Sequence, residues 1–272
     1  MSEDLPGAGT GPRAVDASVP HAPRIWNYWL GGKDHFAADR EVGDRMAQMY
    51  PDIVELARAD RAFLGRAVRY LVREAGVRQF LDIGTGLPTA SNTHEVAQGI
   101  APQCRVVYVD NDPLVLSHAR ALLVSSPEGA TDYIDADARD PERILRIAAR
   151  TLDFGQPVAV MLLGVLIYVS DNAEAYRIVT QLMDVLPSGS YLVIAHSTSE
   201  VRGQATEELV RTRNKFVEPP MTLRSAQQIT RFFDGLELVE PGVVSCPRWR
   251  PDPTDIGHPT DVDEFCALAR KP

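Results

Sequence analysis

Three aspartates, each at the end of a short apolar run, have the residue type and position to bind a ligand. Asp82 closes the run in FLDIGTG, Asp110 closes it in RVVYVDND, and Asp137 follows it in YIDADARD. A carboxylate accepts hydrogen bonds from hydroxyl and amino groups and attracts positive charge. Three of them at successive strand ends predict a binding site for a polar ligand that carries several such donors.

Two glycines follow the first aspartate at an interval of two residues. Gly84 and Gly86 allow a tight turn and let a ligand approach the backbone without a Cβ in the way. A nicotinamide-binding turn would read G-x-G-x-x-G, with the pyrophosphate at the N-terminus of the next helix. Here the third position is Thr89, preceded by Pro88. Because Asp82 would repel a pyrophosphate, the turn favours a ligand with an ammonium group.

The other two aspartates complete a nucleoside site. Asp110, with Asn111 beside it, would accept hydrogen bonds from ribose hydroxyls at the end of the second strand. Asp137 would accept from an adenine amino group, and the backbone N–H of Ala138 would donate to the ring. An ammonium at Asp82, a ribose and an adenine together predict S-adenosylmethionine. Another nucleotide bound to the same type of sheet is the alternative.

Short apolar runs that alternate with helical patterns must position these residues. The runs QFLDIG, RVVYVD, TDYIDAD, PVAVMLLGVLIYV and SYLVIAHS are strand-like, and intervening patterns such as DPERILRIAARTL are helical. This alternation predicts an α/β fold, a parallel sheet with helices on both faces. In such sheets ligands bind beyond the carboxyl ends of the strands. The final runs, LELVEPGVVSCPRW and EFCALARK, have no helix between them and predict an antiparallel pair.

Composition divides the chain into three parts. Residues 1–20 are rich in Pro, Gly, Ala and Ser without periodicity, so we expect a disordered leader. Residues 21–76 carry helical patterns and are predicted to form a lid that keeps water from the reacting groups. Residues 77–272 are predicted to form the S-adenosylmethionine-binding domain.

The predicted lid contains further candidates for the cofactor site. Tyr28, between two tryptophans in WNYWLGGKDHF, would stack on the ligand or hydrogen-bond to it, although these aromatic residues could equally pack the lid onto the sheet. Arg61 would pair with the methionine carboxylate through two hydrogen bonds. The alternative for Arg61 is a structural ion pair with Asp60 or Asp82. Asp60 and Arg61 both fall close to an apolar helical stripe, where charges need partners.

Charge and targeting signals exclude several classes of protein. The formal net charge of -9 argues against binding to a nucleic-acid backbone. No apolar run is long enough to span a membrane, and the N-terminus lacks the features of a secretory signal. The three cysteines have no metal-site spacing and are expected to be reduced thiols in a cytoplasmic protein.

Several of these motifs resemble those of the class I S-adenosylmethionine-dependent methyltransferases: LDIGTG, VYVDND, DADARD and LLGVLIYV. The segment RIWNYWLGGKDHFAADR, with GTGLPTASNTHEVAQ, resembles more narrowly a bacterial S-adenosyl methyltransferase family formerly catalogued as a domain of unknown function. The resemblance covers residues 20–270. It implies the Rossmann-like methyltransferase fold, a seven-stranded, mostly parallel sheet of order 3-2-1-4-5-7-6 with strand 7 antiparallel. It implies no acceptor, and Pro88 departs from loops that have a third glycine.

Methyl transfer from a sulfonium requires alignment and, for an oxygen or nitrogen acceptor, removal of a proton. The candidate bases are His196, at the end of SYLVIAHS, and Tyr168, after the fourth strand. Gly164, expected in the cofactor site, would leave room for the acceptor to approach. The acidic charge and the absence of an N-P-P-Y motif favour O- or N-methylation of a small molecule over nucleic acid. The alternatives are a non-enzymatic module that binds S-adenosylmethionine or S-adenosylhomocysteine and, less favoured, an NAD-dependent dehydrogenase.

Overall fold

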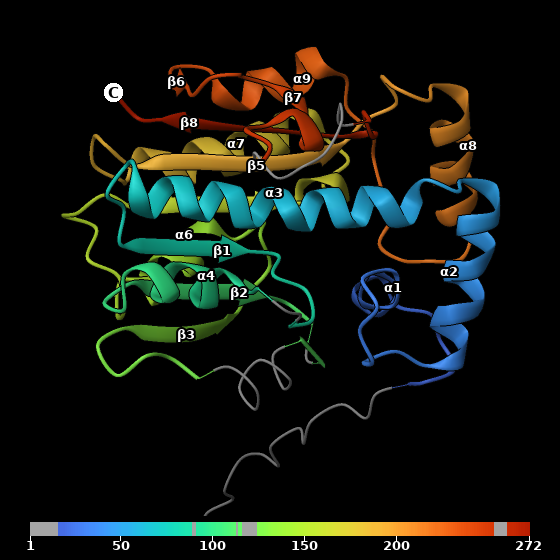
Figure 1. The fold of residues 1–272 in the computed structure, drawn as a ribbon, viewed down its shortest axis with the longest axis horizontal. Coiled ribbons are helices and arrows are strands. Elements are labelled where there is room, and N and C mark those ends of the chain that lie inside the picture. Colours follow the sequence, from blue (N-terminus) through green and yellow to red (C-terminus); the bar gives the residue numbers. More distant parts are fainter. Residues whose placement is uncertain (1–15, 89–90, 113, 116–123, 253–259) are drawn as a thin grey trace, which may run out of the picture.

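One mixed sheet forms the centre of the protein (Figure 1). In this computed structural model the strand order is β3-β2-β1-β4-β5-β8-β6, and β7 also pairs with β8. The pairs among β1 to β5 are parallel, whereas β8 runs antiparallel to β5. The strands are β1 (Gln79–Ile83), β2 (Arg105–Asp110), β3 (Ala130–Asp135), β4 (Ala159–Leu163), β5 (Tyr191–Ser197), β6 (Glu237–Leu238), β7 (Val244–Ser245) and β8 (Glu264–Arg270).

This order confirms the predicted methyltransferase sheet, because β8 occupies the place of the antiparallel seventh strand. The short β7 is additional. The apolar run that was expected to form one strand is divided between β6 and β7, which both pair with β8. Pro241 and Gly242 separate the two; proline has no N–H for the ladder, and Gly242 has a φ of +82°.

The structure describes residues 16–88, 91–112, 114–115, 124–252 and 260–272. Most of the predicted leader, residues 1–15, lies outside them. Among the described residues no helix is sufficiently long and apolar to cross a membrane. The helices of the described parts are α1 (Ala22–Trp29), α2 (Ala37–Met49), α3 (Ile53–Arg73), α4 (Thr93–Ile100), α6 (Pro141–Ala148), η1 (Leu166–Tyr168), α7 (Asn172–Asp184), α8 (Gln204–Arg213), α9 (Ala226–Thr230), η2 (Arg231–Phe233) and η3 (Cys246–Arg248).

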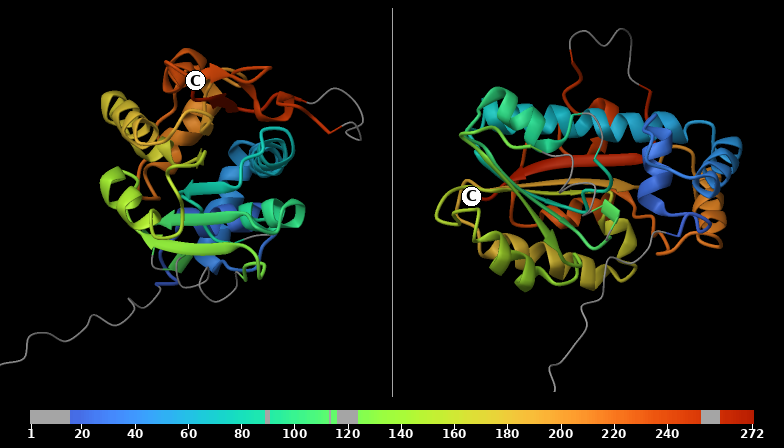
Figure 2. Two further views of the ribbon diagram at one scale, coloured as in Figure 1. Left: turned by 90° about the vertical axis from the view of Figure 1, so that its left-hand side faces the viewer. Right: turned by 90° about the horizontal axis from the view of Figure 1, so that it is seen from below.

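Helices cover both faces of the sheet and give each face its own core (Figure 2). Side chains of successive strand residues point to opposite faces. Leu81 and Ile83 of β1 therefore pack in the cluster that includes α6 and α7, whereas Phe80 packs in the cluster of α3 and α4. By the same alternation Asp82 lies on the α3 face. Strands buried on both faces explain the nearly continuous apolar runs of the sequence.

The segment predicted as a lid occupies two positions. α1 and α2 lie at the edge of the sheet where the parallel strands end, together with α8 (Figure 1). α3 instead runs along one face, with Leu71 and Val68 fully buried in the core. Gly76, at a φ of +70°, follows the end of α3 and turns the chain toward β1.

A buried ion pair joins α1 to α2. Asp39 Oδ2 lies 2.9 Å from Arg24 Nε, and the two side chains are only 0% and 3% exposed. Asp39 also accepts hydrogen bonds from the backbone N–H groups of His21 and Phe36, at 2.9 and 2.8 Å. This single carboxylate therefore holds the start of α1 and the start of α2 together.

Replacing Asp39 by Asn should destabilise these helices, because the buried Arg24 guanidinium would lose its counter-charge. Breaking a buried pair costs about 3–5 kcal/mol, and urea unfolding should show a loss of this order. The matched control is Glu41→Gln, which removes an exposed pair with Arg45 on the same helix and should cost less than about 0.5 kcal/mol. Equal losses for the two variants would contradict the importance of the buried pair.

Candidate functional site

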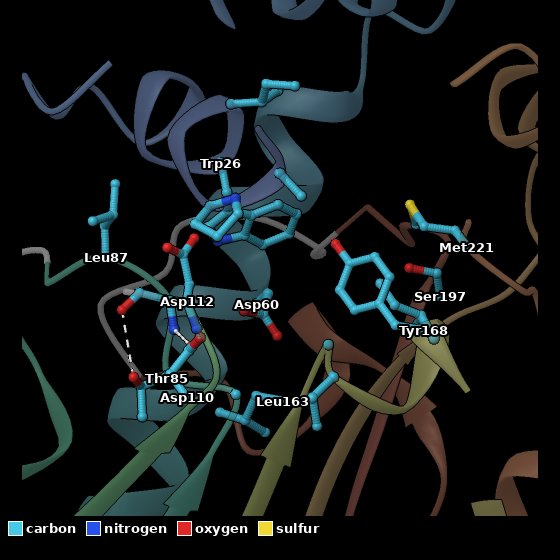
Figure 3. Close-up of a pocket in the computed structure, with 18 of the residues that line it drawn as sticks. Trp26, Asp60, Thr85, Leu87, Asp110, Asp112, Leu163, Tyr168, Ser197 and Met221 are labelled. Carbon is cyan, nitrogen blue, oxygen red and sulfur yellow. Dashed lines mark hydrogen bonds between the residues drawn. The ribbon is translucent and has the colours of Figure 1, made fainter. Parts of the chain in front are cut away.

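A cavity of about 450 Å³ lies at the carboxyl edge of the parallel strands (Figure 3). One part is walled by the loops that follow β1, β2 and β3, with Trp26 of α1 above them. The other part lies beyond Leu163 of β4 and is walled by η1, the end of β5, the start of β8, and α8 with the chain that follows it. We call these the strand-end half and the β4–β8 half.

The glycine turn after β1 forms the floor of the strand-end half. Gly84 and Gly86 have φ values of +78° and +63°, a region that side chains disfavour. A Cβ on Gly84 would lie 2.5 Å from the Cβ of Val165, so this position has no room for a side chain. A Cβ on Gly86 would contact nothing within 4 Å, so the backbone there faces open space. The Gly86 N–H donates to Asp110 Oδ2 at 3.0 Å.

Two aspartates after β2 line the same half. Asp110 accepts a second hydrogen bond from the backbone N–H of Asp112 at 2.9 Å. Burial raises the pKa of Asp110 to about 6. Asp112 Oδ2 lies 3.0 Å from Nδ1 of His21, immediately before α1. The loop after β2 is therefore tied to the glycine turn on one side and to α1 on the other.

Asn111, Asp137 and Ala138 also line the strand-end half. Asn111 Nδ2 lies 3.5 Å from Asp137 Oδ2, and the backbone N–H of Arg139 donates to Asp137 Oδ1 at 2.9 Å. Asp110 and Asp137, which are far apart in the sequence, therefore belong to one wall.

Asp82 is buried between the sheet and α3. Its Oδ2 accepts a hydrogen bond from Thr93 Oγ1 at 2.6 Å. Burial raises the pKa of Asp82 to about 6, although Thr93 and the charge of Arg61 oppose the rise. Arg61 also lines the cavity and donates to Asn92 Oδ1 at 3.0 Å. Its own pKa is lowered by burial, against the opposing charges of Asp82 and Asp60.

Asp60 lies near the middle of the cavity wall, on α3 (Figure 3). The residue is 8% exposed, and its Oδ1 has no hydrogen-bond partner among the described residues. Burial raises the pKa of Asp60 to about 7; the positive charge of Arg61 lowers it and the negative charge of Asp82 raises it. The sequence offers Asp60 only as a charge near an apolar stripe and as a possible ion-pair partner of Arg61; among the described residues this ion pair is not formed.

The β4–β8 half combines apolar and polar walls. Gly164 has a φ of +69°, and a Cβ built on it would meet no atom within 4 Å. Tyr168 of η1 faces this space, with the Arg213 guanidinium 5.4 Å from its ring centroid. Ser197, at the end of β5, donates to Glu264 Oε2 at 2.6 Å. Burial raises the pKa of the Tyr168 phenol, so it is a hydrogen-bond donor at neutral pH.

His196 does not line this cavity. It points to the sheet face opposite Ser197, because neighbouring strand residues alternate. There it is fully buried, with Nε2 2.7 Å from Arg224 Nη1 and the ring stacked 6.1 Å from that of Phe232. Burial lowers the pKa of His196 to about 3. Its location removes it from the candidates for a catalytic base.

Tyr28 is also absent from the cavity lining. On α1 it points toward α2, where its hydroxyl donates to Asp44 Oδ1 at 2.6 Å. Its ring packs edge-on against His35, at 5.0 Å between centroids. The aromatic residues of α1 that line the cavity are Trp26 and Trp29, and Figure 3 shows Trp26 above the strand ends. The motif lies at the cavity, but the phase of the helix directs residues other than Tyr28 toward it.

Glu264 and Ser197 line the cavity but are not among the residues predicted from the sequence. Glu264 opens the last strand and pairs in register with Ser197, so both side chains lie on the α3 face. Residue type alone does not distinguish a glutamate at a strand start from a surface charge. Only the antiparallel register of β8 against β5 brings it to the cavity.

The raised pKa of Asp60 predicts how stability depends on pH. A carboxyl group whose pKa rises from 3.8 to about 7 on folding stabilises the protein below about pH 4, and this contribution is lost as the pH rises to 7. Asp60→Asn should therefore gain stability relative to the native protein between pH 4 and pH 8, by an amount on the order of 1–4 kcal/mol. The charges that act on this group are Arg61, Asp82 and Glu264.

Thermal unfolding without ligand at several pH values measures this difference. The matched control is Asp234→Asn, because Asp234 is an exposed aspartate after η2. Because this side chain is exposed, its substitution should change the stability by less than about 0.5 kcal/mol at every pH. A constant difference for Asp60→Asn would show that the carboxyl group is not held in a desolvating environment.

Two solved structures are similar to the protein over most of its length. A DUF574 family protein from Streptomyces avermitilis is 45% identical, with a TM-score of 0.90 over 94% of this chain and 99% of that one. A protein from Thermobifida fusca with a provisional methyltransferase assignment is 42% identical, with a TM-score of 0.84 over 93% of this chain and 96% of that one. A comparison with curated proteins gives no match.

The family comparison covers nearly the whole sequence. Residues 8–272 match the model of the S-adenosyl methyltransferase family. Both the narrow resemblance of the N-terminal motif and the predicted ligand of the strand ends agree with this match. The chain belongs to the S-adenosyl methyltransferase family, and S-adenosylmethionine is its cofactor.

Proposed function

We propose that the protein transfers a methyl group from S-adenosylmethionine to an oxygen or nitrogen atom of a small molecule. The observation that carries this proposal is the continuity of the cavity across Gly164. The residues that line the strand-end half suit a nucleoside. The β4–β8 half is a space lined by apolar residues and a few polar groups. Cavities of this kind suit small ligands with most of their surface buried.

The residues of the strand-end half fit the cofactor chemically. Asp110 and Asp137 offer acceptors for the ribose hydroxyls and the adenine amino group, and Ala138 offers a backbone donor. Asp82 is a buried carboxylate suited to the ammonium group, and the space in front of Gly86 leaves the backbone accessible. When bound, S-adenosylmethionine supplies an electrophilic methyl carbon on a positively charged sulfur.

The residues of the β4–β8 half would bind and orient the acceptor. Tyr168 keeps its proton at neutral pH, so its role in the proposal is to donate a hydrogen bond to the acceptor and not to act as the base. Leu163 and Met221 supply apolar contact. Positioning of this kind accounts for much of the rate of an in-line displacement.

We further propose that α1 and α2 act as a lid. Trp26 lies above the strand-end half, and the contact of His21 with Asp112 joins the start of α1 to the loop after β2. A closed lid would exclude water from the reacting groups. The cavity and the acidic net charge support a small-molecule acceptor, without nucleic-acid or membrane partners. The three free cysteines support a cytoplasmic location.

Calorimetry followed by a transfer screen tests the function. S-adenosylmethionine and S-adenosylhomocysteine should bind, and NAD should not. A screen of small phenols, carboxylic acids and amines with isotopically labelled methyl donor should then yield a methylated product. Tight binding without transfer to any class would support a non-enzymatic binding module instead, and binding of NAD alone would support a dehydrogenase.

Asp110→Asn should weaken the binding of S-adenosylhomocysteine by at least about tenfold. Hydrogen bonds to a charged group contribute about 1.5–3 kcal/mol each, and the substitution removes the charge while keeping the shape. The matched control is Asp135→Asn, because Asp135 is the register partner of Asp110 on β3, is exposed and lies outside the cavity. Unchanged affinity for the Asp110 variant would remove this residue from the ribose site.

Trp26→Ala tests the proposed lid. Loss of the indole should weaken S-adenosylhomocysteine binding by about tenfold, the effect of about 1.4 kcal/mol of lost contact, and should increase the proteolytic sensitivity of α1 in the complex. Tyr28→Phe, on the same helix but outside the cavity, should leave the affinity unchanged. If both variants bind like the native protein, α1 is a packing element and not a lid.

A further inference from the structure

Two buried carboxyl groups face the cavity, one from α3 and one from the start of β8. Asp60 is 8% exposed and Glu264 is 1% exposed, and both line the cavity. Figure 3 shows the Asp60 carboxylate between the group of Asp110 and Asp112 and the group of Tyr168 and Ser197. The two residues come from α3 and from the start of β8, elements that are about 200 residues apart in the chain.

The arrangement of the elements brings both carboxyl groups to the cavity, on the sheet face that α3 covers. Glu264 pairs in register with Ser197, so the alternation of β8 directs it to the face covered by α3. Burial raises the pKa of Glu264, and the charge of Asp60 raises it further. One Glu264 oxygen accepts the Ser197 hydroxyl at 2.6 Å, whereas Asp60 Oδ1 has no partner among the described residues.

Two other buried acids in the described part of the chain have their charge satisfied, whereas Asp82 accepts a hydrogen bond from Thr93 and forms no ion pair there. Asp39 pairs with Arg24 at 2.9 Å. Asp263, next to Glu264, accepts hydrogen bonds from Tyr50, from Thr206 and from two backbone N–H groups. No salt bridge to Asp60 or Glu264 forms among the described residues, although Arg61 adds positive charge nearby. An uncompensated buried charge is unfavourable, so such groups often mark a ligand site.

We propose that the methyl acceptor is an amine and that its ammonium group binds between Asp60 and Glu264. The inference rests on the proposed function and narrows its acceptor class to nitrogen. A protonated amine supplies the positive charge and the N–H donors that the two carboxyl groups lack. Ser197 holds Glu264 in place, and Tyr168 offers a hydrogen-bond donor to other polar groups of the acceptor.

The same pair would remove the proton that blocks the reaction. An ammonium group has no free electron pair, so one N–H bond must break and its proton must pass to a carboxylate, with Asp60 as the acceptor of that proton. The nitrogen then carries the methyl carbon in place of the proton, and the electron pair of the broken carbon–sulfur bond stays on sulfur. One amine proton is released for each methyl transferred.

Paired binding measurements test the inference without knowledge of the natural acceptor. S-Adenosylhomocysteine has no group at the position of the methyl, whereas sinefungin carries a protonated amino group there. If Asp60 and Glu264 face that position, sinefungin should bind the native protein at least about tenfold more tightly than S-adenosylhomocysteine does. The reason is that charge-assisted hydrogen bonds are stronger than neutral ones. Isothermal calorimetry of both ligands gives the ratio of their dissociation constants directly.

The variants Asp60→Asn and Glu264→Gln should each reduce this preference by about tenfold and change the affinity for S-adenosylhomocysteine much less. Glu218→Gln, which removes an exposed carboxylate from the cavity lining, should keep the preference. If either buried variant fails to fold, Ser197→Ala is the substitute, because it frees Glu264 from its hydrogen bond and should also reduce the preference.

Each other outcome overturns the inference. Equal affinities of the native protein for sinefungin and S-adenosylhomocysteine would show that no carboxylate faces the methyl position. Equal weakening of both ligands by Asp60→Asn would place Asp60 at the amino-acid end of the cofactor. Transfer to phenols or carboxylic acids but not to amines would also overturn the inference, while the proposed function would stand. Failure of both ligands to bind would instead refute the proposed function.

Discussion

Burial of several carboxyl groups around one cavity, with no ion pair to any of them among the described residues, is the constraint on which this site depends. Asp60, Asp82, Asp110 and Glu264 surround one cavity, and burial raises the pKa of each above its ordinary value. Several buried arginines do not neutralise them, since they donate to backbone carbonyl groups: Arg66, Arg213 and Arg224. Arg61 supplies part of the compensating positive charge, and the positive groups of S-adenosylmethionine would add to it.

Much of this arrangement could be predicted, because it follows from periodicity and chain order. Parallel strands end at one edge, so Asp82, Asp110 and Asp137 had to meet wherever the strands paired in the usual order. The glycine turn was equally readable, since Gly84 and Gly86 adopt the positive φ values that their spacing suggested. The strand order was predicted from the family resemblance and is confirmed. These features depend on local sequence and on general rules of connection.

The remaining features depend on how the strands pair in register and on which side of a helix a residue lies. The type of a residue does not determine either. His196 and Ser197 are adjacent at the end of β5, yet only Ser197 lines the cavity, because one residue along a strand reverses the face. The phase of α1 likewise directs Trp26 inward and Tyr28 toward α2. Glu264 reaches the cavity through pairing with a strand some 67 residues away. Knowledge of the tertiary pairing is required in each case.

The position of Asp60 connects stability to function. It lies on α3, whose neighbouring residues Phe63 and Leu64 are buried in the core, so the carboxyl group cannot move toward water without disturbing the sheet packing. The unfavourable free energy of its charge at neutral pH therefore lowers the stability of the protein without ligand. A cationic ligand that enters the cavity relieves this destabilisation and binds only the folded state, so the same free energy appears as affinity and as ligand-dependent stability. α3 fixes the position of the Asp60 carboxyl group. The charge that destabilises the protein without ligand is therefore already in place for a cationic ligand, and no rearrangement is needed when that ligand binds.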